Sequence, residues 1–284
     1  MNKELLIKEI LSPDAFIISP LVGGMMNESC IVGAKDKKYV LYVSTDQANE
    51  MVNRSLERDN QALVYSLGIT SKNVYFDTEK GIKINEYIEG HSLDKINDYS
   101  LKKVAKLLHI LHNSKKLSQE DYHPFTRFIS YENEAKSFVK EIDKDYLSLR
   151  ETLFNNKEYL ESQKMVLCHN DAQKSNIVKS DKDEYFLIDF EFMGNNDPIY
   201  DIATFGNGTV EEGFELLKEY APNPSIDLMR RYYLWRIFVS LQWYNVALVK
   251  HYRGEGAIHN FNFLSVADFF LNNAKTAKKY LSNL

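Results

Sequence analysis

A polar loop between two apolar runs carries the residues of this sequence whose types and spacing are best suited to chemistry. The loop holds His169, Asp171 and Asn176 in the pattern His-x-Asp-x4-Asn. The second apolar run is followed by a short hairpin turn at 180–184, and Asp189 comes directly after the next apolar run. Transfer of a phosphoryl group needs a carboxylate beside the acceptor hydroxyl and hard oxygen ligands for Mg²⁺. Asp171 suits the first role, and Asn176 and Asp189 suit the second.

Each of these residues also has a simpler interpretation. Asp and Asn are common turn formers, and His169 could hold the loop by hydrogen bonds without touching substrate. The combination favours chemistry, because the loop lies between two strand-like runs and is followed closely by an apolar-Asp-Phe-Glu segment. The other conspicuous histidines, His109 and His112, lie on an apolar helical pattern and are predicted to be packed and hydrogen-bonded. No His or Cys cluster in the sequence has metal-ligand spacing.

The elements that must position this loop change in type along the chain. Runs rich in Val, Ile, Tyr and Phe predict strands before residue 90. These runs cover 16–22, 29–34, 39–43, 73–76 and 82–88. One helix is predicted among them over 53–67, with Gly68 as its C-terminal cap.

Beyond Gly90 the periodicity becomes helical. Helices are predicted over 101–112, 131–143, 146–161, 211–220, 226–251 and 261–281, interrupted by short strands at 165–168 and 185–188. The chain is therefore predicted to be an α+β protein. Residues 1–89 would form a β-rich nucleotide-binding lobe, and residues 90–284 a helical catalytic and substrate-binding lobe. A ligand site between two lobes is a common arrangement.

Composition restricts the class of partner. The 284-residue chain has a formal net charge of -5, which gives it no long-range attraction for phosphodiester backbones and argues against nucleic acid. The two cysteines, Cys30 and Cys168, are too few for a disulfide framework or a zinc site, which predicts a reduced, cytoplasmic protein. No run approaches the roughly 18 to 20 apolar residues of a membrane span.

The motifs resemble those of the choline/ethanolamine kinase family, within the wider aminoglycoside-phosphotransferase and kinase-like superfamily. The catalytic-loop pattern and the Ile-Asp-Phe-Glu segment at 188–191 carry the resemblance most specifically. The stretch 196–203, Asn-Asp-Pro-Ile-Tyr-Asp-Ile-Ala, is similar to the one that follows the metal motif in bacterial choline kinases. Weaker similarities lie at 23–27, 51–57 and 83–88, so that the resemblance spans about residues 21–205.

This resemblance implies a protein-kinase-like fold, with a small antiparallel sheet lobe and a large helical lobe, that uses ATP and Mg²⁺. It implies that Asp171 is the catalytic base or orienter, assisted by His169. It also implies that Asn176 and Asp189 are Mg²⁺ ligands and that Glu191 is a further carboxylate of the metal shell. Asp201 is expected to brace the catalytic loop.

The resemblance places the nucleotide against the first lobe. Gly23 and Gly24, with Asn27, would form the turn over the phosphates, because glycines allow the backbone to approach closely. A simple hairpin turn explains two glycines equally well. The adenine would lie against the linker strand, where Glu86 and Ile88 are expected to contact the nucleotide.

One position departs from the family pattern. Tyr42 stands on the third strand, where a Lys or Arg is expected to hold the phosphates. A phenol cannot neutralise phosphate charge, so another cation must take this role or nucleotide binding is weakened. Lys83 and Arg54 are candidates, and a shifted alignment would instead favour Lys37 or Lys38.

The acceptor is predicted to be a small hydroxylated molecule, with choline first. A quaternary ammonium is recognised by aromatic faces and carboxylates. Trp235, Trp243 and Tyr244 lie on a long helix where choline kinases keep part of their aromatic cage, although aromatic residues on such a helix are commonly core residues. The alternatives are an aminoglycoside, thiamine or sugar kinase of the same fold, or a catalytically weak nucleotide-binding protein.

Overall fold

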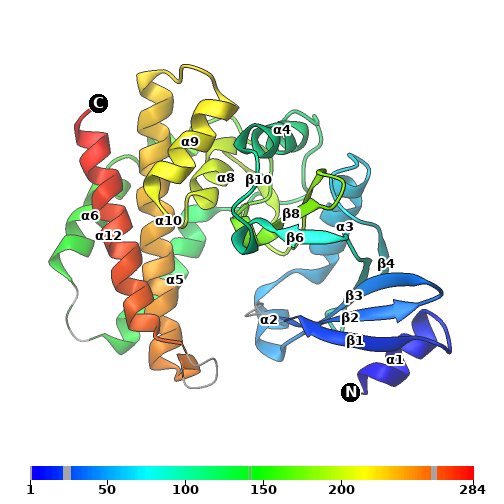
Figure 1. Ribbon diagram of the computed structural model, residues 1–284. Helices are drawn as coiled ribbons and strands as arrows, with labels where there is room; N and C mark the ends of the chain where they lie inside the picture. The colour runs from blue at the N-terminus through cyan, green and yellow to red at the C-terminus, as the bar shows by residue number, and fades with distance from the viewer. Residues whose placement is uncertain (1, 22–26, 140, 142, 257–260) are drawn as a thin grey trace. The chain divides into compact units, whose positions relative to one another are not determined.

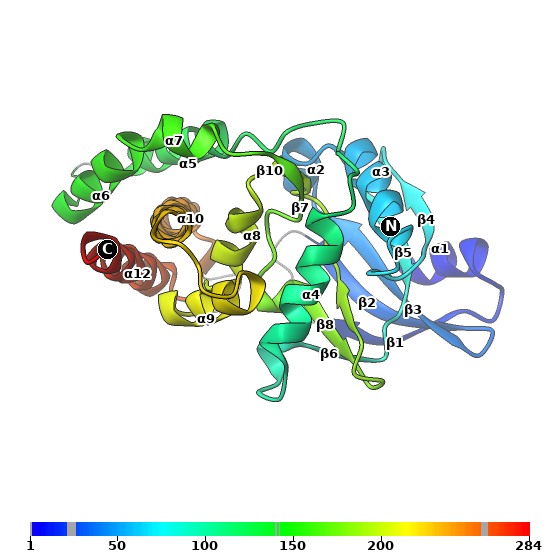
Figure 2. The same ribbon diagram turned by 90° about the horizontal axis from the view of Figure 1, so that it is seen from above.

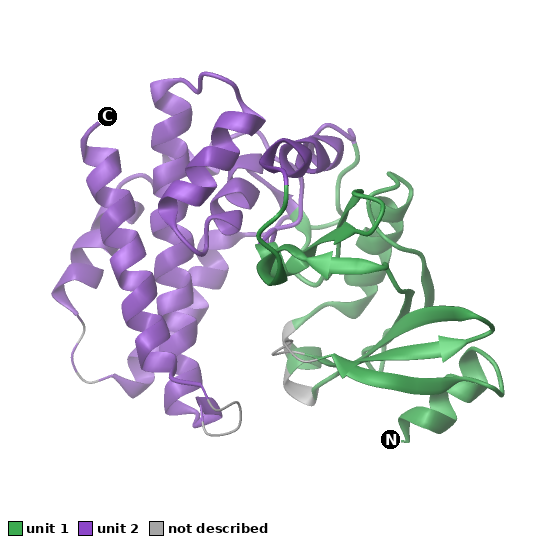
Figure 3. Cartoon of the chain, in the orientation of Figure 1, with its two compact units in different colours: residues 1–99, 116–120, 174–194 green, residues 100–115, 121–173, 195–284 purple. Residues whose placement is uncertain are grey.

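The structure is a computed structural model that describes residues 2–21, 27–139, 141, 143–256 and 261–284. The chain divides into two compact units (Figure 3). Unit 1 comprises Met1–Tyr99, Lys116–Glu120 and Lys174–Gly194, and unit 2 comprises Ser100–Lys115, Asp121–Gln173 and Asn195–Leu284.

Unit 1 is built on a five-stranded antiparallel sheet in the order β1-β2-β3-β5-β4 (Figure 1). The strands are β1 (Phe16–Leu21), β2 (Asn27–Ala34), β3 (Lys37–Ser44), β4 (Asn73–Asp77) and β5 (Ile82–Glu86). The tight turn between β2 and β3 has two residues with positive φ, which suits the twist of a hairpin. Alternate apolar residues, among them Val32, Leu41 and Ile84, are buried and form the core of this sheet.

The helices of unit 1 are short. They are α1 (Lys3–Ile10), α2 (Asp46–Met51), α3 (Arg54–Tyr65) and the 3₁₀ turns η1 (Leu93–Lys95) and η2 (Lys174–Asn176). The Asn53 side chain caps α3 by accepting a hydrogen bond from the backbone of Leu56 at 3.1 Å. Gly68 follows the helix with φ of 73°, as its predicted role in ending the helix requires. The buried face of α3 is largely polar, which is unusual for a helix that covers a sheet.

A second, three-stranded sheet completes unit 1. Its strands are β6 (Gly90–Ser92), β8 (Ile177–Ser180) and β9 (Tyr185–Leu187), in the order β6-β8-β9. Gly90 has φ of 154°, and a Cβ at this position would lie 2.2 Å from the carbonyl oxygen of Lys179, so only glycine fits. Because β8 and β9 pair with β6, segment 174–194 belongs to unit 1. The units therefore differ from the predicted division between residues 89 and 90.

Unit 2 is mainly helical. Its helices are α4 (Leu101–His112), α5 (Pro124–Phe138), α6 (Lys144–Phe154), α7 (Lys157–Glu161), α8 (Pro198–Phe205), α9 (Val210–Tyr220), α10 (Ile226–Tyr252) and α12 (Phe263–Ser282). The long helices α10 and α12 run side by side (Figures 1 and 2). Strand β7 (Val166–Cys168) pairs with the short strand β10 (Gly194–Asn196) in a two-stranded sheet. Rings from α5, α8 and α10 form the centre of the unit.

Two of the predicted helices were wrong in detail. Helix α5 begins at Pro124 rather than at residue 131, because proline is well tolerated in the first turn of a helix. It ends at Phe138, before the predicted end at residue 143. The predicted helix 146–161 is broken into α6 and α7, and the Asn156 side chain at the break donates to the carbonyl oxygen of Thr152 at 2.8 Å. Helix α8 was not predicted.

Within the described part of the chain, none of the helices combines the length and the apolar character that a bilayer crossing requires.

Candidate active site

The loop after β7 positions Asp171 in unit 2. Asn170, next to it, has φ of 64°, which turns the chain sharply after the strand. The His169 side chain is fully buried, and its Nδ1 accepts a hydrogen bond from the backbone N–H of Asp171 at 3.3 Å. The Gln173 amide donates to Oδ2 of Asp171 at 3.2 Å. His169 therefore shapes the loop, and the Asp171 carboxylate is held in a defined orientation.

Asp201, on α8, holds this loop in place through hydrogen bonds to its backbone. Its two carboxylate oxygens accept hydrogen bonds from the backbone N–H groups of His169 at 2.8 Å and Asn170 at 2.7 Å. Nε2 of His112, on α4, lies 2.9 Å from Oδ2 of Asp201, and Nδ1 lies 2.9 Å from the hydroxyl of Tyr220. Nε2 can donate to Asp201 while Nδ1 accepts from the Tyr220 hydroxyl, so one tautomer satisfies both contacts. The predicted bracing role of Asp201 and the packed, hydrogen-bonded state of His112 are confirmed.

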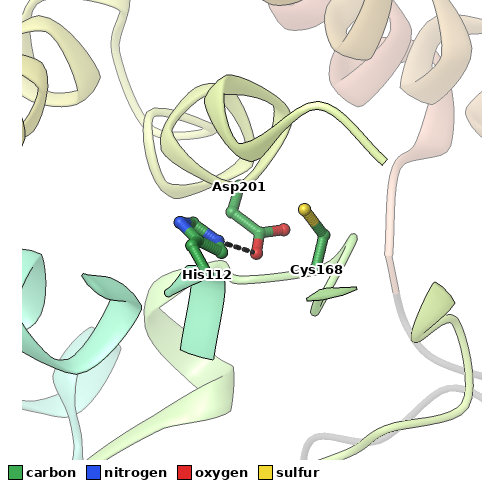
Figure 4. Close-up of side chains that lie close together, drawn as sticks. All are labelled: His112, Cys168 and Asp201. Atoms are coloured by element: carbon green, nitrogen blue, oxygen red, sulfur yellow. Dashed lines mark hydrogen bonds and ion pairs between the residues drawn. The ribbon is translucent and has the colours of Figure 1, made fainter. Parts of the chain in front are cut away.

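The side chains of His112, Cys168 and Asp201 lie close enough together to suggest a metal site (Figure 4). Their hydrogen bonds indicate another purpose. The Cys168 thiol donates to the carbonyl oxygen of Asn196 at 3.3 Å, and burial together with Asp201 raises the pKa of this thiol, which keeps it protonated. A metal would need the thiolate and would compete with the bonds that hold the catalytic loop. The cluster is therefore a hydrogen-bonded support of the loop.

The two predicted Mg²⁺ ligands Asn176 and Asp189 are brought together in unit 1. Asn176 ends η2, and its carbonyl oxygen accepts a hydrogen bond from the backbone N–H of Ile188 at 3.0 Å. Asp189 follows immediately and has φ of 67°, a strained conformation for a residue other than glycine. Strain of this kind at a motif residue is typical of a functional position. The predicted third member, Asp171, belongs to unit 2, and its convergence with the other two stays a prediction.

Helix α3 and strand β5 add a buried charged cluster beside Asp189. Glu57 is 1% exposed and lies 2.5 Å from Nζ of Lys83 and 2.6 Å from NH1 of Arg54. Lys83 Nζ is also 3.4 Å from Oδ1 of Asp189, and Arg54 NH1 is 3.5 Å from Oε2 of Glu191. Burial opposes the charge on both Lys83 and Glu57. Their mutual attraction outweighs it, which raises the pKa of Lys83 and lowers that of Glu57.

The acids of this cluster fit a divalent cation. Burial and the neighbouring Asp189 raise the pKa of Glu191 to about 8, a sign that negative charge is concentrated here. Among the described residues no donor hydrogen-bonds to Oε2 of Glu191, although this atom is buried. Carboxylates with an amide oxygen are a donor set that Mg²⁺ prefers. Asn176, Asp189 and Glu191 are thus chemically suited to hold Mg²⁺.

Tyr42 lies directly opposite Lys83 in the pairing of β3 with β5. Opposite residues of an antiparallel pair project from the same face, and Lys83 Nζ lies 4.8 Å from the centroid of the Tyr42 ring. The cation missing from β3 is therefore present on the neighbouring strand. From the sequence, Lys83 was only one of several candidates for the phosphate-binding cation, because the pairing of strands cannot be read from the sequence.

The predicted nucleotide contacts of unit 1 are only partly described. Gly23 and Gly24 lie outside the described residues. Asn27 begins β2, and its side-chain oxygen accepts a hydrogen bond from the Ser44 hydroxyl at 2.8 Å. Glu86 is the last residue of β5, and its Oε1 lies 3.6 Å from Nζ of Lys37. Ile88 lies in the segment between β5 and β6. Contacts of these residues with a nucleotide stay predictions.

The three aromatic residues predicted for the acceptor lie in different surroundings along α10. Trp235 is 1% exposed, and its Nε1–H donates to Oδ2 of Asp197 at 2.7 Å within the ring core of unit 2. Trp243 stacks on Phe270 of α12. Tyr244 stacks on Tyr146 and lines a surface hollow of about 470 Å³ that also contains residues 141 and 143–145. The three side chains do not share a common set of neighbours.

Two buried tyrosines of unit 2 were not singled out in the sequence. The hydroxyls of Tyr122 and Tyr200 are 3.5 Å apart and both rings are buried. Burial raises the pKa of both phenols, and the charge of Asp171 makes a smaller contribution in the same direction. The Arg127 guanidinium lies 4.9 Å from the centroid of the Tyr122 ring. Tyr200 lies in the segment 196–203 that carried a family resemblance, whereas no sequence signal marks Tyr122.

A small antiparallel sheet whose flanking helix pairs a glutamate with a lysine, and a helical unit with a braced His-x-Asp loop, define a fold of the protein-kinase-like phosphotransferases. Residues 18–262 match the family described as choline/ethanolamine kinase. The chain belongs to this family.

Individual relatives are consistent with the family. Protein LicA of Haemophilus influenzae is 30% identical over 189 residues, which make up 64% of this chain and 56% of that protein. The chain thus matches little more than half of the length of that relative. A crystal structure of choline kinase LicA from Streptococcus pneumoniae has a TM-score of 0.75 and 26% identity, with 100% of each chain covered. A structure of LicA in complex with AMP has the same TM-score and identity and covers 99% of this chain and 96% of that one.

Proposed function

We propose that the protein transfers the γ-phosphoryl group of ATP to the hydroxyl of choline, with Mg²⁺ as the metal. The observation that carries this proposal is the cluster in unit 1. There the carbonyl oxygen of Asn176 accepts a hydrogen bond from the backbone of Ile188, and the strained Asp189 is the next residue. The Lys83–Glu57 pair lies next to Asp189. Carboxylates, an amide and a buried lysine at one place are the groups that a metal-bound triphosphate requires.

The metal would be held by Asn176, Asp189 and Glu191. When bound, it would neutralise charge on the phosphate oxygens. The residues themselves supply oxygen ligands: Asn176 is 7% exposed and the Glu191 side chain 5% exposed, whereas the Asp189 side chain is 30% exposed and is accessible to a metal. Nucleotide use is supported by the AMP complex of LicA.

Asp171 would act on the acceptor. The choline oxygen attacks the γ-phosphorus, the bond from this phosphorus to the bridging oxygen breaks, and ADP leaves. The hydroxyl proton passes to the Asp171 carboxylate, which gives phosphocholine. The Gln173 amide and the brace of Asp201 hold the carboxylate for this role, and such positioning accounts for much of the catalysis of phosphoryl transfer.

Choline is supported as the acceptor by the similar LicA structure, which is described as a choline kinase. Roles of Trp243 and Tyr244 at the acceptor stay predictions.

The test is ADP release from Mg²⁺-ATP with choline, ethanolamine, thiamine, a sugar and an aminoglycoside as separate acceptors. We expect choline-dependent ADP and phosphocholine, identified by mass. Asp171→Asn should lower the turnover by about 100-fold or more. Asp181→Asn, at an exposed turn between β8 and β9, is the matched control and should leave the turnover unchanged.

Two results would contradict the proposal. Turnover of another acceptor at a greater kcat/KM would assign a different substrate within the same reaction class. ATP binding without turnover of any acceptor would indicate a nucleotide-binding protein rather than an enzyme.

A further inference from the structure

The third strand of the sheet, β3, carries no buried lysine or arginine, because its two lysines, Lys37 and Lys38, are exposed. In protein kinases a lysine on this strand holds the nucleotide phosphates and pairs with a helix glutamate. Here the strand carries Tyr42, and burial raises the pKa of its phenol to about 12, so the ring stays neutral. The helix glutamate, Glu57, is nevertheless present and almost fully buried. A buried glutamate with no cationic partner would be strongly destabilising, and the charge of Glu57 is matched both by Arg54 on its own helix and by a lysine from another strand.

Lys83 matches it from the neighbouring strand β5. Its side chain crosses the face of Tyr42 and reaches Glu57 at 2.5 Å and Asp189 at 3.4 Å. The residue is 4% exposed and is the one buried lysine in the part of the chain that the structure describes. Lysine is rarely buried, and a paired, buried ammonium that also contacts a candidate metal ligand is placed for function.

The other cations named for this role are less suitable. Lys37 and Lys38 are exposed on β3 and pair with Glu86 and Glu89. Arg54 is buried, but its NH1 and Nε are already engaged by Glu57 and the Asn49 side chain, and its acidic neighbour at the metal cluster is Glu191, 3.5 Å away, rather than Asp189. Among the described residues, Lys83 is the only cation that forms ion pairs with both Glu57 and Asp189.

We propose that Lys83, supplied by β5, binds the nucleotide phosphates in place of the lysine that related folds carry on β3, with Tyr42 as the surface that supports its side chain. This inference rests on the proposed function, because it assumes that ATP is bound beside Asp189. It means that the cation has moved between adjacent strands while its helix partner has stayed in place. Tyr42 is then an adaptation of the site rather than a sign of lost nucleotide binding.

The main experiment compares Lys83→Met with Lys38→Met, a matched change of an exposed lysine on β3. Thermal melting first checks that both variants are folded. We expect Lys83→Met to weaken the binding of a fluorescent ATP analogue and to raise the KM for ATP by about 10- to 100-fold. The KM for choline should change by less than about twofold, because the acceptor is recognised elsewhere. Lys38→Met should behave like the wild type.

A double variant tests the exchange between strands. Tyr42→Lys combined with Lys83→Met returns an ammonium to β3 and keeps a partner for Glu57, so it also guards against misfolding of the single variant. We expect it to recover at least about tenfold of the lost ATP affinity. A folded double variant that binds ATP no better than Lys83→Met would contradict the exchange.

A third measurement uses the wild-type protein. An acyl-phosphate derivative of ATP transfers its acyl group to a lysine amine near the phosphates, forming an amide as the acyl-phosphate bond breaks. Peptide mapping should find the label on Lys83, and excess ATP should prevent it. Label confined to Lys37 or Lys38 would overturn the inference.

These outcomes separate the inference from the proposed function. If choline is phosphorylated but Lys83→Met keeps the wild-type affinity for ATP, the inference fails and the function stands. If no acceptor is phosphorylated but ATP binding and labelling depend on Lys83, the function fails and the phosphate-binding role of Lys83 stands.

Discussion

Replacing Asp201 with Asn should damage the catalytic loop without changing any residue that contacts substrate. The carboxylate accepts hydrogen bonds from the backbone of His169 and Asn170 and from His112, at 2.7 to 2.9 Å. Asn has one acceptor oxygen, so its NH₂ group must face one of these donors. At least one hydrogen bond to a charged group is lost, and such bonds are worth about 1.5–3 kcal/mol each. The His169 and Asn170 backbone groups belong to buried residues, so water cannot replace the bond.

We therefore expect Asp201→Asn to lower the free energy of unfolding of unit 2 by about 3 kcal/mol. Turnover should fall by about 100-fold, because a displacement of about 1 Å at a positioned group has effects of this size. Both tryptophans, Trp235 and Trp243, lie in unit 2, so urea unfolding followed by tryptophan fluorescence reports on this unit.

The matched control is Asp145→Asn. Asp145 is exposed and pairs with Lys275 at 2.5 Å on the surface of unit 2, where ion pairs contribute about 0–1 kcal/mol. An Asp201→Asn variant that matched this control within about 0.5 kcal/mol and kept wild-type turnover would contradict the bracing role of Asp201.

Three further predictions concern other residues. Asp189→Asn should raise the Mg²⁺ concentration needed for half-maximal turnover by about tenfold or more, measured by Mg²⁺ titration, and an unchanged requirement would exclude Asp189 as a ligand. Trp235→Phe removes the donor to the buried Asp197 and should lower stability by about 1–3 kcal/mol with the KM for choline unchanged; a raised KM with full stability would instead place Trp235 at the acceptor. The pKa of Glu132 is lowered from its ordinary value of 4.5, because hydrogen bonds to Arg150 and others outweigh burial, so its stabilising effect is present above that pH and is lost as the pH falls below it. Glu132→Gln should therefore lose less stability than the wild type between about pH 6 and pH 3, and equal losses in urea unfolding would contradict this.

Local signals in the sequence were sufficient where one element's own residues determine its structure. Helix α4 has the predicted bounds of 101–112, because a clear apolar face follows the capping residue Ser100. The hairpin between β8 and β9 was likewise predicted from its turn. The break between α6 and α7 and the early start of α5 were not, since single side chains such as Asn156 and Pro124 decide them.

Prediction of the site residues was limited in the same way, since only local patterns can be read from the sequence. Asp171, Asn176 and Asp189 could be predicted as site residues because their spacing along the chain is itself the signal, and their roles stay predictions. Lys83 was named only as one of several candidates, because its pairing with Tyr42 depends on the register of two strands that are distant in the sequence. Tyr122 was not predicted because its contact with Tyr200 arises only through tertiary packing.

The most direct test of the account is ³¹P NMR of the wild-type protein with Mg²⁺-ATP and choline. The γ-phosphate resonance of ATP should disappear as the signals of ADP and of one phosphomonoester, phosphocholine, increase together. Release of inorganic phosphate alone, or an ATP spectrum that does not change, would contradict phosphoryl transfer to the choline hydroxyl.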